Sequence, residues 1–167
     1  MFTLKQFFSA AFTTAVAGSM TAEALSQPSI KGVRDVVLVH GAFADGSSWS
    51  KVVTKLQAKG YNVIAVQNPL TSFEDDVAAA KRAIAQLEGP VIWAGDFNTW
   101  NSDRQAHLDK NAAALGLHHL KPTNEKRNLK LDHIYVRGLE LQSVELLRHI
   151  KSSDHLPLKA VFKKAPS

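Results

Sequence analysis

The chain contains no cysteine among its 167 residues. This absence excludes a disulfide scaffold, a cysteine-ligated zinc site and a thiol nucleophile. Hydrophobic residues make up 45% of the chain and charged residues 21%. That composition and that length predict one folded domain with a core, not a disordered chain.

Acidic residues are the minority among the charged ones, with 15 Asp and Glu against 20 Lys and Arg, and the formal net charge is +5. Such an excess favours an anionic partner, and it serves solubility equally well, so both interpretations stay open. Aromatic residues are not interleaved with the late basic residues as in proteins that bind single-stranded nucleic acid. These basic residues are Lys121, Lys126, Arg127, Lys130, Arg137, Arg148, Lys151, Lys159, Lys163 and Lys164.

The first 29 residues have very few charges. Lys5 is the only one before Glu23, and residues 7–18 between them are mostly apolar. This pattern predicts a signal peptide over residues 1–29, cleaved near Ala24, and a periplasmic or secreted mature chain. The apolar stretch is too short and too rich in Ser, Thr and Gly for a membrane span, so we expect no integral span in the mature chain. A disordered or loosely anchored amphipathic N-terminus is the alternative.

Residues 30–94 show a regular alternation of strand and helix patterns. Short apolar runs at 35–39, 61–66 and 91–94 predict buried strands. Segments 49–59 and 72–87 have helical spacing of apolar residues, and Ser72 is a good N-cap for the second. Strand, helix, strand, helix, strand predicts a βαβαβ segment with a parallel sheet and right-handed crossovers.

The turn after the first strand carries a recognisable motif. Val37-Leu38-Val39-His40-Gly41-Ala42-Phe43 is followed by Gly46-Ser47-Ser48-Trp49. With these motifs, residues 34–92 resemble the N-terminal part of α/β-hydrolase-fold esterases. The resemblance implies that the backbone N–H of Ala42 or Phe43 is a remnant of an oxyanion hole. The alternative is a tight strand-to-helix turn that needs a small residue at position 41.

The chain lacks the serine that such an esterase needs. A Gly-x-Ser-x-Gly motif is expected after the third strand, and it occurs nowhere in the sequence. The chain has Gly95-Asp96-Phe97-Asn98-Thr99 there, with Phe97 in the position of the serine. An acyl-enzyme therefore cannot form at this position.

Residues 89–162 carry three other motifs in a fixed order. They are Gly-Asp-Phe-Asn at 95–98, Leu-Asp-His-Ile-Tyr-Val-Arg-Gly at 131–138, and Ser-Ser-Asp-His at 152–155. We predict a helix at 102–115 and strands at 131–138, 140–147 and 157–162. In this order the motifs resemble the C-terminal half of the endonuclease/exonuclease/phosphatase family, the deoxyribonuclease-I-like phosphodiesterases. The resemblance implies a C-terminal α+β half-sandwich over residues 89–167, joined to the βαβαβ segment.

The family resemblance also implies roles for five residues. Asp96 would orient or deprotonate the attacking water, and Asn98 would hydrogen-bond the phosphate or that water. His155 would stabilise the charged phosphoryl oxygens, with Asp132 holding its imidazole in place. Asp154, together with Asp96, would lie at a Mg²⁺ or Mn²⁺ ion. The alternative is that Asp96 and Asn98 form a turn, Asp154 and His155 a cap, and Asp132 a surface acid.

The N-terminal half of that family supplies a glutamate that is the chief metal ligand, and its motif is missing here. A hard cation needs several oxygen ligands, so metal binding should be weak unless Asp45 or Glu74 replaces that glutamate. The esterase-like segment stands in its place, which suggests a chimera with its junction at Gly89–Gly95. Each half would then lack the partner that covers its apolar face. His118 and His119, a tempting metal pair, are interpreted as a surface loop.

Three functions follow from these patterns. The first is a metal-dependent phosphodiesterase, nuclease or phosphatase-like hydrolase with an incomplete active site. The second is an esterase-like α/β hydrolase without its serine, and the third is a non-catalytic fusion remnant that binds anions. The substrate and the oligomeric state have no signature in the sequence.

Overall fold

The computed structural model describes residues 33–126, 130–151 and 153–163, so the predicted signal peptide lies outside the described part. The first half of this part contains β1 (Asp35–Val39), a 3-10 turn (Gly46–Trp49), α1 (Ser50–Gln57), β2 (Asn62–Ala65), α2 (Phe73–Ala85) and β3 (Val91–Asp96). The second half contains α3 (Ser102–Ala114), β4 (His118–His119), β5 (Asp132–Arg137), β6 (Leu141–Leu146) and β7 (Leu158–Phe162). The fold is mixed α/β, as the sequence predicts.

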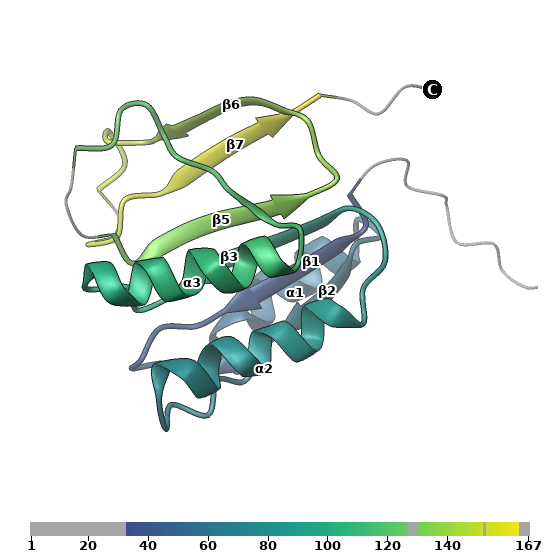
Figure 1. The fold of residues 1–167 in the computed structure, drawn as a ribbon. Helices are drawn as coiled ribbons and strands as arrows, with labels where there is room; N and C mark the ends of the chain where they lie inside the picture. Colours follow the sequence, from purple (N-terminus) through teal and green to yellow (C-terminus); the bar gives the residue numbers. More distant parts are fainter. Residues whose placement is uncertain (1–32, 127–129, 152, 164–167) are drawn as a thin grey trace, which may run out of the picture.

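Five strands form one mixed sheet in the order β2-β1-β3-β5-β4 (Figure 1). β1 pairs in parallel with β2 and with β3. β3 pairs on its other edge with β5, antiparallel, with Asp96 opposite Asp132. The strand β3 is therefore the seam between the parallel and the antiparallel part of the sheet.

The core lies between this sheet and two helices that cover one of its faces. α2 and α3 pack against each other on this face (Figure 1). Their apolar side chains form one core cluster with residues of β1, β3 and β5. The strand residues of this core are Val37 and Val39 on β1, Val91 and Trp93 on β3, and Tyr135 on β5. On β1 and β3 the core residues come at every second position, because residues two apart on a strand share a face. The largest of the strand residues are Trp93 and Tyr135, and they pack against Ile84 and Leu108 on the helices.

Both helices begin at side-chain caps. Ser72 accepts a hydrogen bond from the N–H of Asp75, and Asn101 accepts one from the N–H of Arg104. Such caps satisfy backbone donors that the first helical turn leaves free. The predicted helices at 72–87 and 102–115 are therefore confirmed as α2 and α3, each slightly shorter than predicted.

Arg137, one of the late basic residues of the sequence, fixes the C-terminal ends of both helices. Its guanidinium donates to the carbonyl oxygens of Leu87 and Gly89 after α2 and of Leu115 after α3, at 2.6, 3.1 and 3.1 Å. Carbonyl groups at a helix C-terminus have no partner inside the helix, so a fork of N–H donors satisfies them. The sequence shows Arg137 only as one of the late basic residues and does not predict this structural role.

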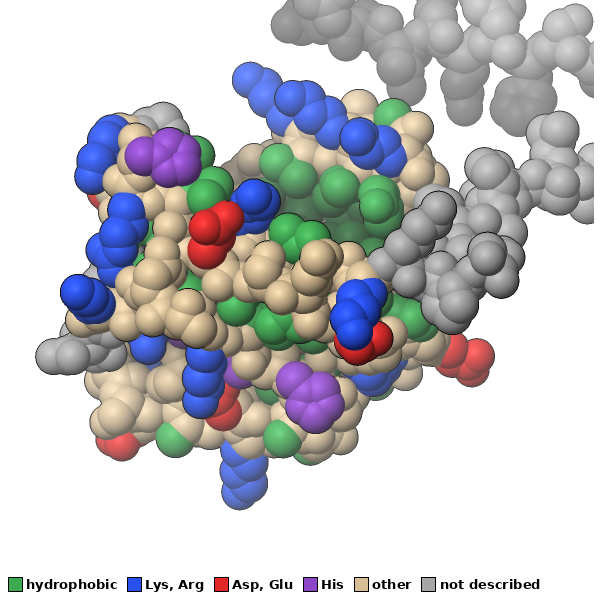
Figure 2. Space-filling view, turned by 90° about the horizontal axis from the view of Figure 1, so that it is seen from above, with side chains coloured by type: hydrophobic (Ala, Val, Ile, Leu, Met, Phe, Trp, Pro, Cys, Tyr) green, Lys and Arg blue, Asp and Glu red, His purple; other side chains and the backbone are tan. Residues whose placement is uncertain are grey.

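The strands β6 and β7 form a separate antiparallel pair, which lies beside β5 and away from α2 (Figure 1). Asn124 holds this pair to the rest of the molecule, because its side chain bonds both the N–H and the carbonyl of Leu146. Figure 2, which views the molecule from above Figure 1, shows apolar side chains in a hollow, with Lys and Arg side chains around it. Leu141 on β6 is among the large apolar residues that remain exposed.

The helices of the described ranges are short. None of them has the length and apolarity needed to cross a membrane.

Candidate active site at the strand ends

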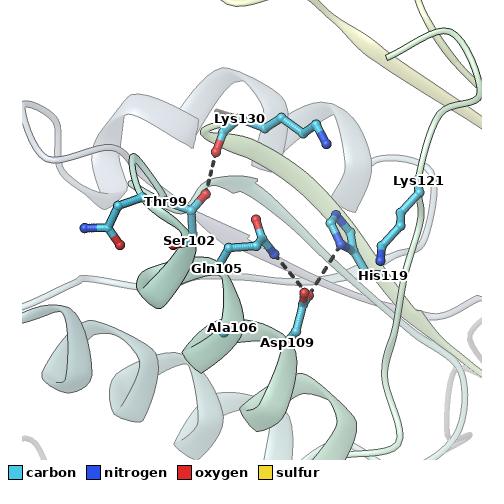
Figure 3. A pocket seen from close by; sticks show the side chains of 9 residues that line it. Thr99, Ser102, Gln105, Ala106, Asp109, His119, Lys121 and Lys130 are labelled. Atoms are coloured by element: carbon cyan, nitrogen blue, oxygen red, sulfur yellow. Dashed lines mark hydrogen bonds and ion pairs between the residues drawn. The ribbon is translucent and has the colours of Figure 1, made fainter. Parts of the chain in front are cut away.

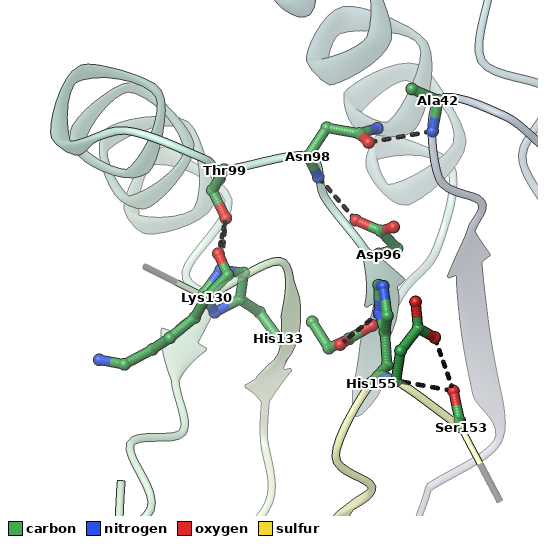
Figure 4. Close-up of polar contacts among 10 residues, drawn as sticks. Ala42, Asp96, Asn98, Thr99, Lys130, His133, Ser153 and His155 are labelled. Carbon is green, nitrogen blue, oxygen red and sulfur yellow. Dashed lines mark hydrogen bonds and ion pairs between the residues drawn. The ribbon is translucent and has the colours of Figure 1, made fainter. Parts of the chain in front are cut away.

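The polar residues of interest gather at one edge of the main sheet. The parallel strands β1 and β3 both end there, and the antiparallel strand β5 begins there. In open α/β sheets, ligands bind outside the carboxyl ends of the parallel strands. This edge carries Asp96, Asn98, Asp132 and His155 together (Figure 4).

Asp96 ends β3 and lies directly against the turn that follows β1. A Cβ added to Gly41 would approach Oδ2 of Asp96 within 2.4 Å, so only glycine leaves space for this carboxylate. Its other oxygen, Oδ1, accepts a hydrogen bond of 2.9 Å from the N–H of Asn98. Asp96 is half-buried, and its carboxylate lies between the turn at Gly41 and the N–H of Asn98.

Asn98 is buried and takes a left-handed backbone conformation, with φ at 53°. Asparagine tolerates this region better than most residues do. Its Oδ1 accepts a hydrogen bond of 2.9 Å from the N–H of Ala42. That bond leaves the two N–H donors of Nδ2 for a ligand. It also uses the N–H of Ala42, one of the two backbone donors that the esterase resemblance assigns to an oxyanion hole.

Asp132 and His155 form a pair across 23 residues of sequence. Nδ1 of His155 lies 2.8 Å from Oδ2 of Asp132. This hydrogen bond, together with the nearby negative charges of Asp132, Asp96 and Asp154, raises the pKa of His155 above its ordinary value, against the effect of burial. A carboxylate on one ring nitrogen orients the imidazole and favours its cationic form.

The other candidate residues from the sequence are Asp154, Phe43, Asp45 and Glu74. Asp154 is exposed and accepts a hydrogen bond of 3.3 Å from the hydroxyl of Ser153. The side chain of Phe43 is fully exposed. Asp45 caps the 3-10 turn by accepting from the N–H of Ser47, and Glu74 is exposed in the first turn of α2.

The residues of the described ranges include no group of three or more His, Asp or Glu side chains that could hold a metal ion. A hard cation such as Mg²⁺ needs several oxygen ligands in a near-octahedral arrangement. The carboxylates of Asp96 and Asp154 alone do not provide that. The donor set in this part of the chain therefore does not fit a tightly held divalent ion.

A second polar cluster, which the sequence analysis missed, lies behind Thr99. The hydroxyl of Thr99 is 2.6 Å from the carbonyl oxygen of Lys130 and 2.7 Å from Nε2 of His133 (Figure 4). Nδ1 of His133 is in turn 2.9 Å from Nε2 of His119, and Nδ1 of His119 is 3.4 Å from Oδ1 of Asp109. We call this row of contacts the histidine chain.

His119 is thus not part of a surface loop, and that interpretation is wrong. It lies in β4, its side chain is 12% exposed, and its ring stacks on Tyr135 with centroids 4.5 Å apart. Burial lowers the pKa of His119 to about 4 and that of His133 to about 3. The alternation along β5 carries the missed signal, because His133 and Tyr135 are two residues apart and therefore share a face.

A family model described as the endonuclease/exonuclease/phosphatase family matches residues 24–155 of the chain. The matched range runs across the predicted junction at residues 89–95 and includes most of the chain on both sides of it. It also includes Ala42, Asp96, Asn98, Asp132 and His155. No solved protein structure gives a significant match.

Several bacterial proteins named UPF0294 are similar to the chain. One from Vibrio cholerae serotype O1 is 34% identical over 96 residues, which are 54% of this chain and 34% of that protein. One from Yersinia enterocolitica serotype O:8 is 39% identical over 83 residues, which are 47% of this chain and 32% of that protein. The matched segment therefore spans about a third of the length of these curated relatives.

Proposed function

Because the chain belongs to the endonuclease/exonuclease/phosphatase family, we propose that it handles phosphoesters at the Asp132–His155 pair, as a hydrolase with an incomplete metal site. The observation that carries this proposal is the 2.8 Å contact between Nδ1 of His155 and Oδ2 of Asp132, beside the carboxylate of Asp96. Phosphoryl transfer depends mainly on positioning and on charge stabilisation, and a fixed imidazolium supplies charge stabilisation.

Each side chain has a part in the proposed chemistry. The imidazolium of His155 neutralises a phosphoryl oxygen, and Asp132 keeps the ring oriented and protonated. Nδ2 of Asn98 donates to another phosphoryl oxygen, because Oδ1 of the same amide is held by Ala42. The carboxylate of Asp96, at the end of β3, orients the attacking water and accepts its proton.

The expected divalent ion is Mg²⁺ or Mn²⁺, bound weakly. Asp96 and Asp154 are the carboxylates that we expect to contact it, and two such ligands place the dissociation constant at about 1 mM or above. When bound, the ion would add positive charge near the phosphate. The steps assigned above run through side chains alone.

The domain division and the location of the protein remain part of the proposal. We propose that residues 1–29 are a signal peptide and that the remaining chain works in the periplasm or outside the cell. We also keep the division into an esterase-like segment, 30–94, and a phosphatase-like segment, 89–167. The antiparallel pairing of β3 with β5 and its parallel pairing with β1 support a junction on that strand.

The test is hydrolysis of bis-(4-nitrophenyl) phosphate by the full chain, with Mg²⁺ or Mn²⁺ and with or without a chelator. We expect cleavage that rises with millimolar metal and falls at least about 100-fold in His155→Ala. His149→Ala is the matched control, because His149 is an exposed histidine in the same segment. This control should keep the activity of the unmodified chain.

The same assay separates the two alternatives. Cleavage of 4-nitrophenyl acetate that ignores the chelator would favour the esterase-like hydrolase, although buried Phe97 stands where its serine is expected. Phosphate binding without turnover in any variant would favour the non-catalytic anion binder. Equal phosphodiester cleavage by His155→Ala and by the unmodified chain contradicts the proposed site.

A further inference from the structure

A polar pocket of about 370 Å³ lies beside the histidine chain, on the α3 side of the molecule (Figure 3). We call it the α3 pocket. Its lining includes Asp109 on α3, His119 on β4, and the side chains of Lys121 and Lys130. The proposed phosphoester site uses none of these residues. The volume is in the range that holds a small polar ligand.

Two positive charges border the α3 pocket without a partner. In the ranges that the structure describes, the ammonium groups of Lys121 and Lys130 make no ion pair and no hydrogen bond. Both act on the buried ring of His119, whose pKa they lower in addition to the effect of burial. Figure 3 shows both ammonium ends on the His119 side of the pocket. A dianion placed between them would meet two positive charges.

The histidine chain is one proton short of satisfying its own contacts. Four contacts join the carbonyl of Lys130 to Thr99, His133, His119 and Asp109 in turn. The hydroxyl and two neutral imidazoles supply three protons for them. If Thr99 donates to the carbonyl, each ring donates toward Thr99, and Nδ1 of His119 is left without a proton.

The nitrogen that lacks a proton belongs to His119, which lines the α3 pocket. Nδ1 of His119 is fully buried and has no hydrogen-bond partner, and it faces Oδ1 of Asp109 at 3.4 Å. That oxygen already accepts hydrogen bonds from Tyr135 at 2.6 Å and from Gln105 at 3.1 Å. A fourth proton on His119 would turn this contact between two acceptors into an ion pair.

We propose that the α3 pocket binds a tetrahedral dianion, phosphate or a phosphate ester, between Lys121 and Lys130, and that binding draws one proton onto His119. The dianion offsets the repulsion of the two ammonium groups toward the ring and adds its own attraction. The carboxylate of Asp109 would repel the ligand, and the cationic ring beside it cancels that repulsion. Tyr135 and His133, the other titratable groups that face His119, stay neutral.

Linkage fixes the direction of the pH effect. A ligand that raises the pKa of His119 binds more tightly wherever His119 gains a proton, so affinity rises as the pH falls from 7.5 to 5. If the bound state raises that pKa by about two units, the gain at pH 5 is about tenfold. Sulfate is the suitable probe, because its charge stays at −2 over this range whereas phosphate titrates.

The experiment is calorimetric titration of the full chain with sulfate at pH 7.5 and at pH 5, in buffers of different ionisation enthalpy. We expect proton uptake on binding at pH 5 and a dissociation constant about tenfold lower there than at pH 7.5. Lys121→Met and Lys130→Met should each weaken binding about tenfold. Lys110→Met is the matched control, since Lys110 is an exposed lysine on α3 that does not line the pocket.

His119→Gln separates the charge of the lysines from the proton. Glutamine can donate to Nδ1 of His133 and does not titrate, so sulfate should still bind while the pH dependence disappears. Unchanged sulfate affinity in both lysine variants, or tighter binding at pH 7.5 than at pH 5, would overturn the proposal. Comparing inorganic phosphate with phenyl phosphate then identifies the source, because the tighter of the two is the better model of the ligand.

Discussion

The ring of His155 and the carboxylate of Asp132 lie 2.8 Å apart, and this contact joins the loop before β7 to the first residue of β5. It brings a histidine from the loop between β6 and β7 to the edge of the main sheet. The ring is therefore positioned by a side chain of the main sheet.

Asp132→Asn should lower the pKa of His155 toward the ordinary histidine value near 6.5. The reason is that the hydrogen bond to Asp132 is the largest cause of the raised pKa, and an amide keeps the shape without the charge. Titration of the imidazole signals by NMR measures this directly. An unchanged titration midpoint in Asp132→Asn would mean that the contact is absent in solution.

The same pair makes stability depend on pH. The folded-state pKa of His155 exceeds its unfolded value, so the contact stabilises the chain fully below about pH 6.5 and loses that effect as the pH rises through the folded-state pKa. The ring is 36% exposed, so the effect is small. Urea unfolding measures the free energy of unfolding at pH 5.5 and at pH 8.5. This free energy should fall less between the two pH values for His155→Gln than for the unmodified chain.

Asn98→Ala should destabilise the fold by about 1–3 kcal/mol. The substitution removes the hydrogen bond to the N–H of Ala42. It also places alanine, for which the left-handed region is unfavourable, at a backbone φ of 53°. Asn98→Gly removes the hydrogen bond but accepts that φ, so it should lose less than Asn98→Ala. Chemical denaturation of both variants checks the order, and a greater loss in the glycine variant contradicts it.

Gly41→Ala should reduce phosphodiester cleavage about tenfold or more while it leaves the melting temperature nearly unchanged. Its Cβ would occupy the place of Oδ2 of Asp96, and that carboxylate can rotate away at small cost. Gly46→Ala is the control, because its nearest neighbour is the end of the flexible Gln67 side chain at 3.2 Å. Equal activity of the two variants would separate Asp96 from the reaction.

Arg137→Met should lower the free energy of unfolding by about 2–3 kcal/mol, because the carbonyl groups of Leu87, Gly89 and Leu115 lose a charged donor. Denaturation with urea measures the loss. Lys126→Met, which changes an exposed basic residue, should have an effect within about 0.5 kcal/mol. A similarly small effect of Arg137→Met would show that the helix ends do not need it.

Local patterns predict the helices well, because apolar spacing and caps such as Ser72 act within a few residues. The motifs at 95–98 and 131–138 likewise indicate which residues stand at the strand ends. The position of His119 is not predictable in this way, because β4 has two residues and no periodicity. Its burial depends on Tyr135 and Asp109, which reach it only through the packing of α3 on β5. Arg137 is missed for the same reason, since its partners lie 22 to 50 residues away.

The central claim, that His155 held by Asp132 receives a phosphoester, is tested most directly by NMR of the histidine rings during titration with diethyl phosphate, a diester that the chain is not expected to cleave quickly. The account predicts that the signals of His155 shift and that its pKa rises further. The ring signals of exposed His149 should not shift and therefore serve as an internal reference. Signals of His155 that do not move at a saturating concentration of the diester would contradict the account.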